Sequence, residues 1–200
     1  NDLNESKTVD AEYEIFDFEN GTLETNKRTL TVGAVKNSVV FDLNVPFICS
    51  EYDKKRTGIA VRLYENSALI QQKTVLFCRE NELRLPKAEL KTVFEETADG
   101  LNVTVSSDKY ARLVKVESSK ITLPFSDNFF DLLPGQKKTV TIKNDTVVST
   151  TELRNSITAY SLSDIPFSNN KLDTKFKQLK VFLSPTNLSN AIYHGRLTKD

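Results

Sequence analysis

Short stretches of alternating apolar and polar residues recur along the chain, and this period of two constrains the fold more than any other feature. The alternation is clear at residues 39–45, 59–63, 101–105 and 140–142, and it is typical of strands with one buried face. Further strands are predicted at residues 13–18, 29–32, 74–78, 114–116 and 157–162. Regular short strands of this kind predict an all-β fold built from sandwiches.

The chain is long enough for two small domains. A charged stretch that ends at Leu85-Pro86 predicts a boundary there, which gives residues 1–85 and residues 86–167 as two immunoglobulin-like β-sandwich domains in tandem. Residues 168–200 form a short C-terminal extension. Its apolar residues Leu172, Phe176, Leu179 and Leu183 fall at helical spacing, and a helix, a disordered tail and a strand at residues 181–183 all stay open.

Turn and cap signals separate the predicted strands. Asn20-Gly21 is a strong hairpin signal, and Glu65-Asn66-Ser67 predicts a second turn. Ser149 followed by Glu152 is a capping box, so we expect a helical turn before the last strand.

Residues 125–135, with the sequence FSDNFFDLLPG, combine large apolar side chains with polar turn-formers. Pro134 and Gly135 suit the two central positions of a type II turn. We expect the polar side chains at residues 126–128 to bond the local backbone and the apolar ones, Phe129 included, to enter a core. The candidate structural motif comprises Phe125, Ser126, Asp127, Asn128, Phe129, Phe130, Asp131, Pro134 and Gly135.

This motif resembles the signature near the C-terminus of β-mannosidases of glycoside hydrolase family 2. SSDKYARLVKVES precedes it, and KKTVTI and ITAYSLSDI follow it, so the resemblance covers residues 86–165. The upstream stretch IAVRLYENSALIQQKTVLFCRENELRLPKAELK is similar in layout to the penultimate domain of those enzymes. Gln136 departs from the pattern, because the family often has an acid there, and at a surface position beside a turn we expect this change to matter little.

The resemblance implies a non-catalytic accessory region of a retaining β-mannosidase, an enzyme that hydrolyses terminal non-reducing β-D-mannose. Retaining glycosidases need two carboxyl groups about 5 Å apart, and in this family they belong to a barrel upstream of these domains, with the acid in an Asn-Glu pair beside a tryptophan. The chain has no tryptophan, and its pairs Asn4-Glu5 and Asn81-Glu82 lie in polar segments. We therefore expect no catalytic residue here, and the upstream catalytic barrel of the same polypeptide as the partner.

A free-standing carbohydrate-binding or adhesion module is the alternative function. Sugar sites are commonly built on flat aromatic faces, and Tyr52, Tyr64, Tyr110 and Tyr160 are candidate platforms for glycan contact. The absence of tryptophan and the apolar setting of most phenylalanines argue against such a site.

Charge and composition exclude several classes of partner. The chain has 27 basic and 27 acidic residues, so it lacks the basic footprint of a nucleic-acid binder. Its apolar stretches are far shorter than the roughly 18 residues of a membrane span, and its polar start is not a signal peptide, so any export signal would lie further upstream.

The residues that most often bind metals are few. Cys49 and Cys78 are the only cysteines and His194 is the only histidine, so we expect neither a metal nor a cofactor. We expect both cysteines to be free and buried, in or beside strands of the first domain. A disulfide between them is the alternative, because the sequence does not show whether their Cα atoms come within bonding range. We expect a periplasmic or secreted location first, and a lysosome-like compartment second.

Overall fold

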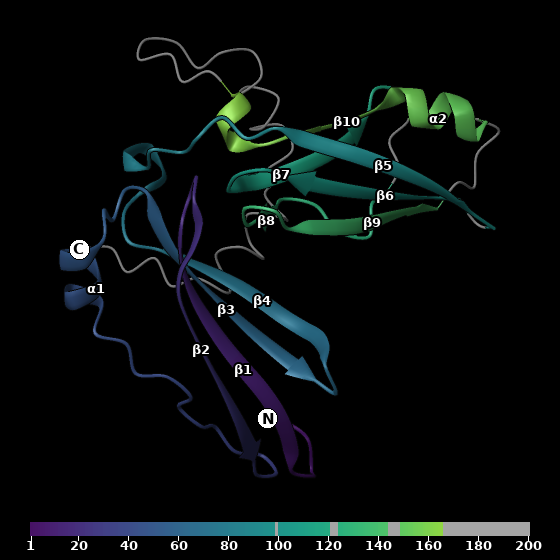
Figure 1. The fold of residues 1–200 in the computed structure, drawn as a ribbon. Helices are drawn as coiled ribbons and strands as arrows, with labels where there is room; N and C mark the ends of the chain where they lie inside the picture. Colours follow the sequence, from purple (N-terminus) through teal and green to yellow (C-terminus); the bar gives the residue numbers. More distant parts are fainter. Residues whose placement is uncertain (99, 121–123, 144–148, 166–200) are drawn as a thin grey trace, which may run out of the picture. The chain divides into compact units, whose positions relative to one another are not determined.

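The computed structural model describes residues 1–98, 100–120, 124–143 and 149–165 (Figure 1). The fold is all-β with two immunoglobulin-like domains in tandem, as the alternation predicted. Both belong to one compact unit, Asn1–Leu162. The boundary after residue 85 stays a prediction. The predicted C-terminal extension and His194 lie outside the described residues.

The first domain is built on one antiparallel sheet with the strand order β2-β1-β3-β4. Its strands are β1 (Lys7–Asp17), β2 (Gly21–Val32), β3 (Thr57–Glu65) and β4 (Ala68–Leu76). The hairpin at Asn20-Gly21 is confirmed, with Gly21 at a φ of 84°. Asn66 and Ser67, both at positive φ, make the predicted turn between β3 and β4.

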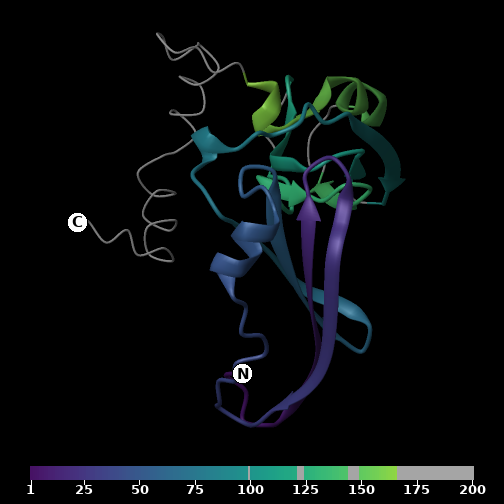
Figure 2. The ribbon, with the colours of Figure 1, turned by 60° about the vertical axis from the view of Figure 1, so that its left-hand side comes forward.

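Helix α1 (Val45–Glu51) and the segment before it cover one face of this sheet (Figure 2). Ile48 of α1 packs on Tyr13, Ile15 and Ile59, and Phe41 and Leu43 pack against the same cluster. The predicted strand at residues 39–45 is therefore wrong. Asn44 begins a helix instead, because its side chain accepts a hydrogen bond from the Phe47 amide at 3.1 Å and Pro46 fits the first helical turn.

The second domain has two three-stranded sheets packed face to face. One contains β5 (Leu90–Thr97), β6 (Gly100–Ser107) and β9 (Lys137–Lys143), and the other β10 (Ile157–Tyr160), β7 (Ala111–Ser118) and β8 (Phe130–Leu132). The alternating residues of β6, β7 and β9 fill the core between them: Leu101, Val103, Val105, Val114, Val116, Val140 and Ile142. This is the predicted sandwich.

Helix α2 (Thr150–Ser156) confirms the predicted capping box. The Ser149 hydroxyl accepts a hydrogen bond from the Glu152 amide at 3.3 Å and donates one to the Glu152 carboxylate at 3.1 Å. Leu153 enters the core of the second domain. Single 3₁₀ turns occur at Glu80–Glu82 (η1) and Leu162–Asp164 (η2).

Candidate functional site: the junction between the two domains

A fully buried aromatic cluster joins the two domains. We call it the junction cluster; its residues are Phe16, Phe18, Ala60, Tyr110 and Leu133. The Tyr110 ring is completely buried, with its centroid 5.1 Å from that of Phe16 and 4.7 Å from that of Phe18. The Tyr110 amide donates to the Phe18 carbonyl at 2.8 Å. Tyr110 therefore contributes to packing between domains, and its prediction as a platform for glycan contact is wrong.

A hydrogen-bond network surrounds the Tyr110 hydroxyl. Asp131 accepts from this hydroxyl at 2.8 Å, from Arg112 Nη1 at 3.1 Å and from the Leu113 amide at 3.0 Å. Arg112 Nη2 also donates to Glu80 at 2.7 Å. Burial, reinforced by the Asp131 charge, raises the pKa of Tyr110, so the phenol stays a neutral donor. The hydrogen bond from Arg112 lowers the pKa of Glu80, which keeps that carboxylate charged.

The polar residues at the start of the motif connect strands. Ser126 extends the β9 ladder, because its amide donates to the Thr141 carbonyl at 2.9 Å and its hydroxyl accepts from the Thr141 amide at 2.9 Å. The Asn128 side chain accepts from the Val116 amide and donates to the Val116 carbonyl, both at 2.8 Å. Asp127 accepts from the Asn128 amide and pairs with Lys138. The predicted local bonding thus holds for Asp127, and Asn128 bonds both the adjacent Phe129 amide and the distant strand at Val116, whereas Ser126 bonds only a distant strand.

The three phenylalanines of the motif have different surroundings. Phe130 is 8% exposed and belongs to the core of the second domain, and half-buried Phe125 packs against that core. Phe129 is 44% exposed, so its predicted place in the core is wrong. The Asn128 side chain accepts a hydrogen bond from the Phe129 amide at 3.2 Å, and a left-handed backbone with φ of 60° turns the ring outward.

The turn at Leu133–Gln136 has the geometry expected of type II. The Gln136 amide donates to the Leu133 carbonyl at 2.9 Å, and Gly135 has a φ of 77°. Pro134 is half-buried and lies in the first half of this turn.

The Gln136 side chain links this turn to the first domain. Its Nε2 donates to Gln72 Oε1 at 2.9 Å, and Gln72 Nε2 donates back to Gln136 Oε1 at 3.3 Å. The expectation that this position matters little is therefore wrong. An ionised acid at position 136 would have no donor for the Gln72 carbonyl oxygen.

The Asn-Glu pairs lie on the surface. Glu5 forms an exposed ion pair with Lys7 at 3.0 Å, and Glu82 accepts from the Arg79 amide in η1. Neither glutamate is buried.

The remaining candidate residues are also placed away from any reactive cluster. Cys49 and Cys78 are free and half-buried, and Cys49 lies in α1 rather than beside a strand. Tyr52, Tyr64 and Tyr160 are half-buried. Across the described ranges, no three His, Cys, Asp or Glu side chains gather as a metal site would require. No helix in the same ranges is long and apolar enough to cross a membrane.

Two family models match the chain in tandem. Residues 1–79 match the model described as a Mannosidase Ig/CBM-like domain, and residues 85–165 match the Ig_mannosidase model, described as an Ig-fold domain. The two domains are mannosidase-type immunoglobulin-like domains. Sequence reasoning missed the junction cluster, because Tyr110 lies far from Phe16 and Phe18 in the chain and shares no motif with them.

A solved structure shares this fold. A β-D-mannosidase from Dictyoglomus thermophilum matches with a TM-score of 0.67 and 21% sequence identity. The match covers 81% of this chain and 19% of that one, so the chain spans about a fifth of the length of that enzyme. Comparison with curated protein sequences finds no match.

Proposed function

We propose that these two domains are the non-catalytic C-terminal accessory region of a retaining β-mannosidase. In this proposal a catalytic barrel upstream in the same polypeptide hydrolyses terminal non-reducing β-D-mannose, and the two domains stabilise it. The tandem order of the two mannosidase-type domains is the observation that carries the proposal.

The junction supports a mechanical role. Three polar contacts cross between the domains: Arg112 donates to Glu80, the Tyr110 amide donates to the Phe18 carbonyl, and Gln136 pairs with Gln72. Within the second domain, Asp131 of the motif accepts from both Tyr110 and Arg112 and so positions them. A buried apolar interface of this kind restricts the relative motion of neighbouring domains more than a flexible linker does.

The alternative is a free-standing carbohydrate-binding or adhesion module. The two functions differ in what precedes residue 1 in the natural protein. A barrel with an Asn-Glu acid and a second glutamate supports the enzyme, and its absence supports the module.

The test is to express the complete natural reading frame and the present chain side by side. We expect the complete protein to hydrolyse a chromogenic β-mannoside, with the β-anomer of mannose appearing first by NMR because two displacements retain configuration. We expect this chain alone to show no turnover above a heat-killed control. Turnover by the isolated chain that survives repurification overturns the proposal.

Export to the periplasm or the medium is the location that we propose for the complete enzyme, with a lysosome-like compartment as the second choice. Cell fractionation with an activity assay tests it, and activity confined to the cytosol contradicts it.

A further inference from the structure

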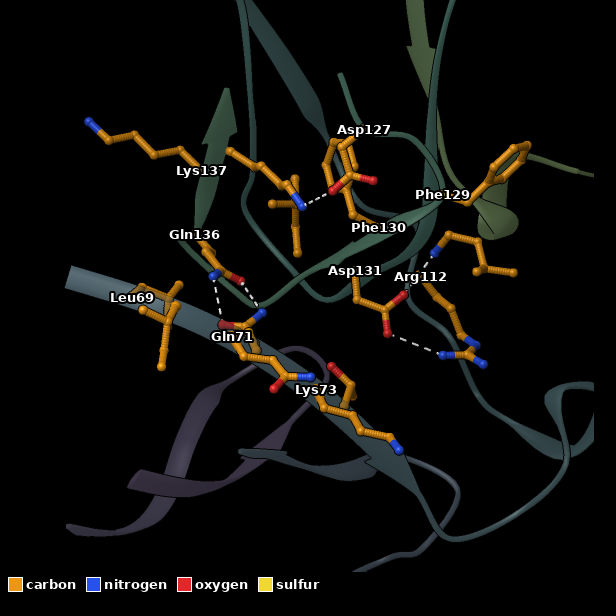
Figure 3. Close-up of a pocket in the computed structure, with 16 residues that line it drawn as sticks. Leu69, Gln71, Lys73, Arg112, Asp127, Phe129, Phe130, Asp131, Gln136 and Lys137 are labelled. Atoms are coloured by element: carbon orange, nitrogen blue, oxygen red, sulfur yellow. Dashed lines mark hydrogen bonds and ion pairs between the residues drawn. The ribbon is translucent and has the colours of Figure 1, made fainter. Parts of the chain in front are cut away.

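A cleft of about 610 Å³ lies beside the junction cluster (Figure 3). Residues 69–74 of β4 line one wall, and residues from 112–113, 127–132 and 136–138 line the other. Its volume is within the roughly 300–1,000 Å³ of small-molecule sites. Arg112, Asp131 and Gln136 of this lining also take part in the junction described above.

The lining of the cleft carries more positive than negative charge. Its cations are Lys73, Arg112, Lys137 and Lys138, and its carboxylates are Asp127 and Asp131, so four positive charges face two negative ones. Asp127 pairs with Lys138 and Asp131 with Arg112. Within the part of the chain that the structure describes, Lys73 and Lys137 form no ion pair. Because the whole chain has a net charge of zero, this local excess favours an anion.

The two lysines without ion pairs, Lys73 and Lys137, lie on opposite walls of the cleft, and their side chains extend away from each other in Figure 3. A ligand that meets both of them therefore carries more than one negative group along its length.

Uncharged groups around the cleft suit a sugar. The half-exposed ring of Phe129 stands at the edge, on a backbone with φ of 60°, and Leu113 in the lining has φ of 51°. Left-handed backbone costs energy in residues other than glycine and is concentrated at ligand sites. The amide of Gln71 and the hydroxyl of Thr74 form no hydrogen bond to the residues that the structure describes, and hydroxyl groups can pair with both.

We propose that the cleft binds an acidic oligosaccharide with carboxylates on successive sugar rings. Lys73 and Lys137 pair with carboxylates, Gln71 and Thr74 bond sugar hydroxyls, and the Phe129 ring packs on an apolar sugar face. An added peptide strand fits less well, because the Gln72–Gln136 pair connects the edge of β4 to the opposite wall. The proposal concerns this chain alone and does not require the β-mannosidase function.

The experiment is an NMR titration of the ¹⁵N-labelled chain with a tetramer of β-1,4-linked mannuronate, and in parallel with neutral mannotetraose. We expect the acidic tetramer to shift the amides of residues 69–74 and 127–138 in a saturable manner. We expect the neutral tetramer to bind about tenfold more weakly or not at all, and 0.5 M salt to weaken the acidic tetramer because it screens exposed charges.

Three variants locate the site. Lys73→Gln and Lys137→Gln should each weaken binding about two- to five-fold, the range of an exposed ion pair. Phe129→Gly removes the ring on a backbone that glycine adopts readily, so the fold survives and affinity falls. Lys91→Gln, at an exposed pair with Glu89 on β5, is the matched control.

Four results overturn the proposal. They are no saturable binding of the acidic tetramer, equal binding of both tetramers, shifts outside the cleft only, or cleft lysine variants that bind like Lys91→Gln. None of them requires a catalytic assay, so they are distinct from failure of the β-mannosidase function.

Discussion

Tyr110 allows the junction to be tested quantitatively. Its ring is completely buried between Phe16, Phe18 and Leu133, and truncation of a buried aromatic residue to alanine costs about 3–5 kcal/mol. For a chain of 150–250 residues each kcal/mol lowers the melting temperature by about 2–4 °C. We therefore expect Tyr110→Ala to lower it by about 6–20 °C.

A milder substitution isolates the hydroxyl. Tyr110→Phe keeps the ring and removes one of three donors to Asp131. Because the carboxylate keeps its other two donors, we expect the lower end of the range for a hydrogen bond to a charged group, about 1.5 kcal/mol. Tyr64→Ala, at a half-buried tyrosine of β3 away from the junction, is the matched control and should cost less than Tyr110→Ala.

The assay is thermal and urea unfolding of the single variants and of a double-mutant cycle with Phe18→Ala. Phe18 and Tyr110 belong to different domains and their ring centroids lie 4.7 Å apart. We expect a coupling free energy of about 0.5–1.5 kcal/mol, the range for aromatic pairs. If the free-energy losses of Tyr110→Ala and Phe18→Ala simply add in the double variant, the proposed contact between the two domains is wrong. A Tyr110→Ala variant that melts within about 2 °C of the parent contradicts it equally.

Three further predictions follow from single residues. Phe130→Ala should cost about 3–5 kcal/mol because the ring is buried, whereas Phe129→Ala should cost less than about 1 kcal/mol in the same urea titration; equal losses contradict the placement of the two rings. The pKa of Glu80 is lower in the folded chain, so its stabilisation is present above its unfolded pKa of about 4.3 and is lost as the pH falls through the folded value. Glu80→Gln should therefore lower the free energy of unfolding at pH 7 by no more than about 1 kcal/mol, as expected for an exposed pair, and by less at pH 2.5; the same loss at both pH values counts against the ion pair. When the chain is denatured without reductant and treated with an alkylating reagent, Cys49 and Cys78 should each take up one alkyl group. In the native chain Cys78 should react slowly, because burial raises the pKa of its thiol. Alkylation only after reduction argues for a disulfide.

Local signals in the sequence were sufficient for much of the fold. The turns at Asn20-Gly21 and Pro134-Gly135 need a backbone conformation that glycine adopts more readily than other residues. Each residue pair therefore predicted its turn. Strands with clean alternation, such as residues 101–105, were predicted for the same reason, because one face had to be buried.

The errors occurred where a short-range signal competed with the alternation. Residues 39–45 alternate like a strand, yet Asn44 and Pro46 begin α1. The apolar residues Phe41 and Leu43 pack on the core of the first domain without pairing in a β-sheet. Strand β5 was missed because Val93, which is 66% exposed, interrupts its alternation beside Phe94.

The candidate site was less predictable than the fold. The motif at residues 125–135 indicated a packed connection, but not that Asp131 accepts from Tyr110 and Arg112. The Gln72–Gln136 pair joins residues 64 positions apart. Contacts of that kind depend on how the two domains meet, and no periodicity within one strand contains that information.

The accessory role is tested most directly by removing these domains from the complete enzyme. We propose comparing the complete protein with a version that lacks residues 1–200, and with a complete protein that carries Tyr110→Ala, by the half-life of β-mannosidase activity at elevated temperature. We expect a short half-life without the domains and an intermediate one with Tyr110→Ala. A truncated enzyme that keeps the activity and half-life of the complete protein contradicts it.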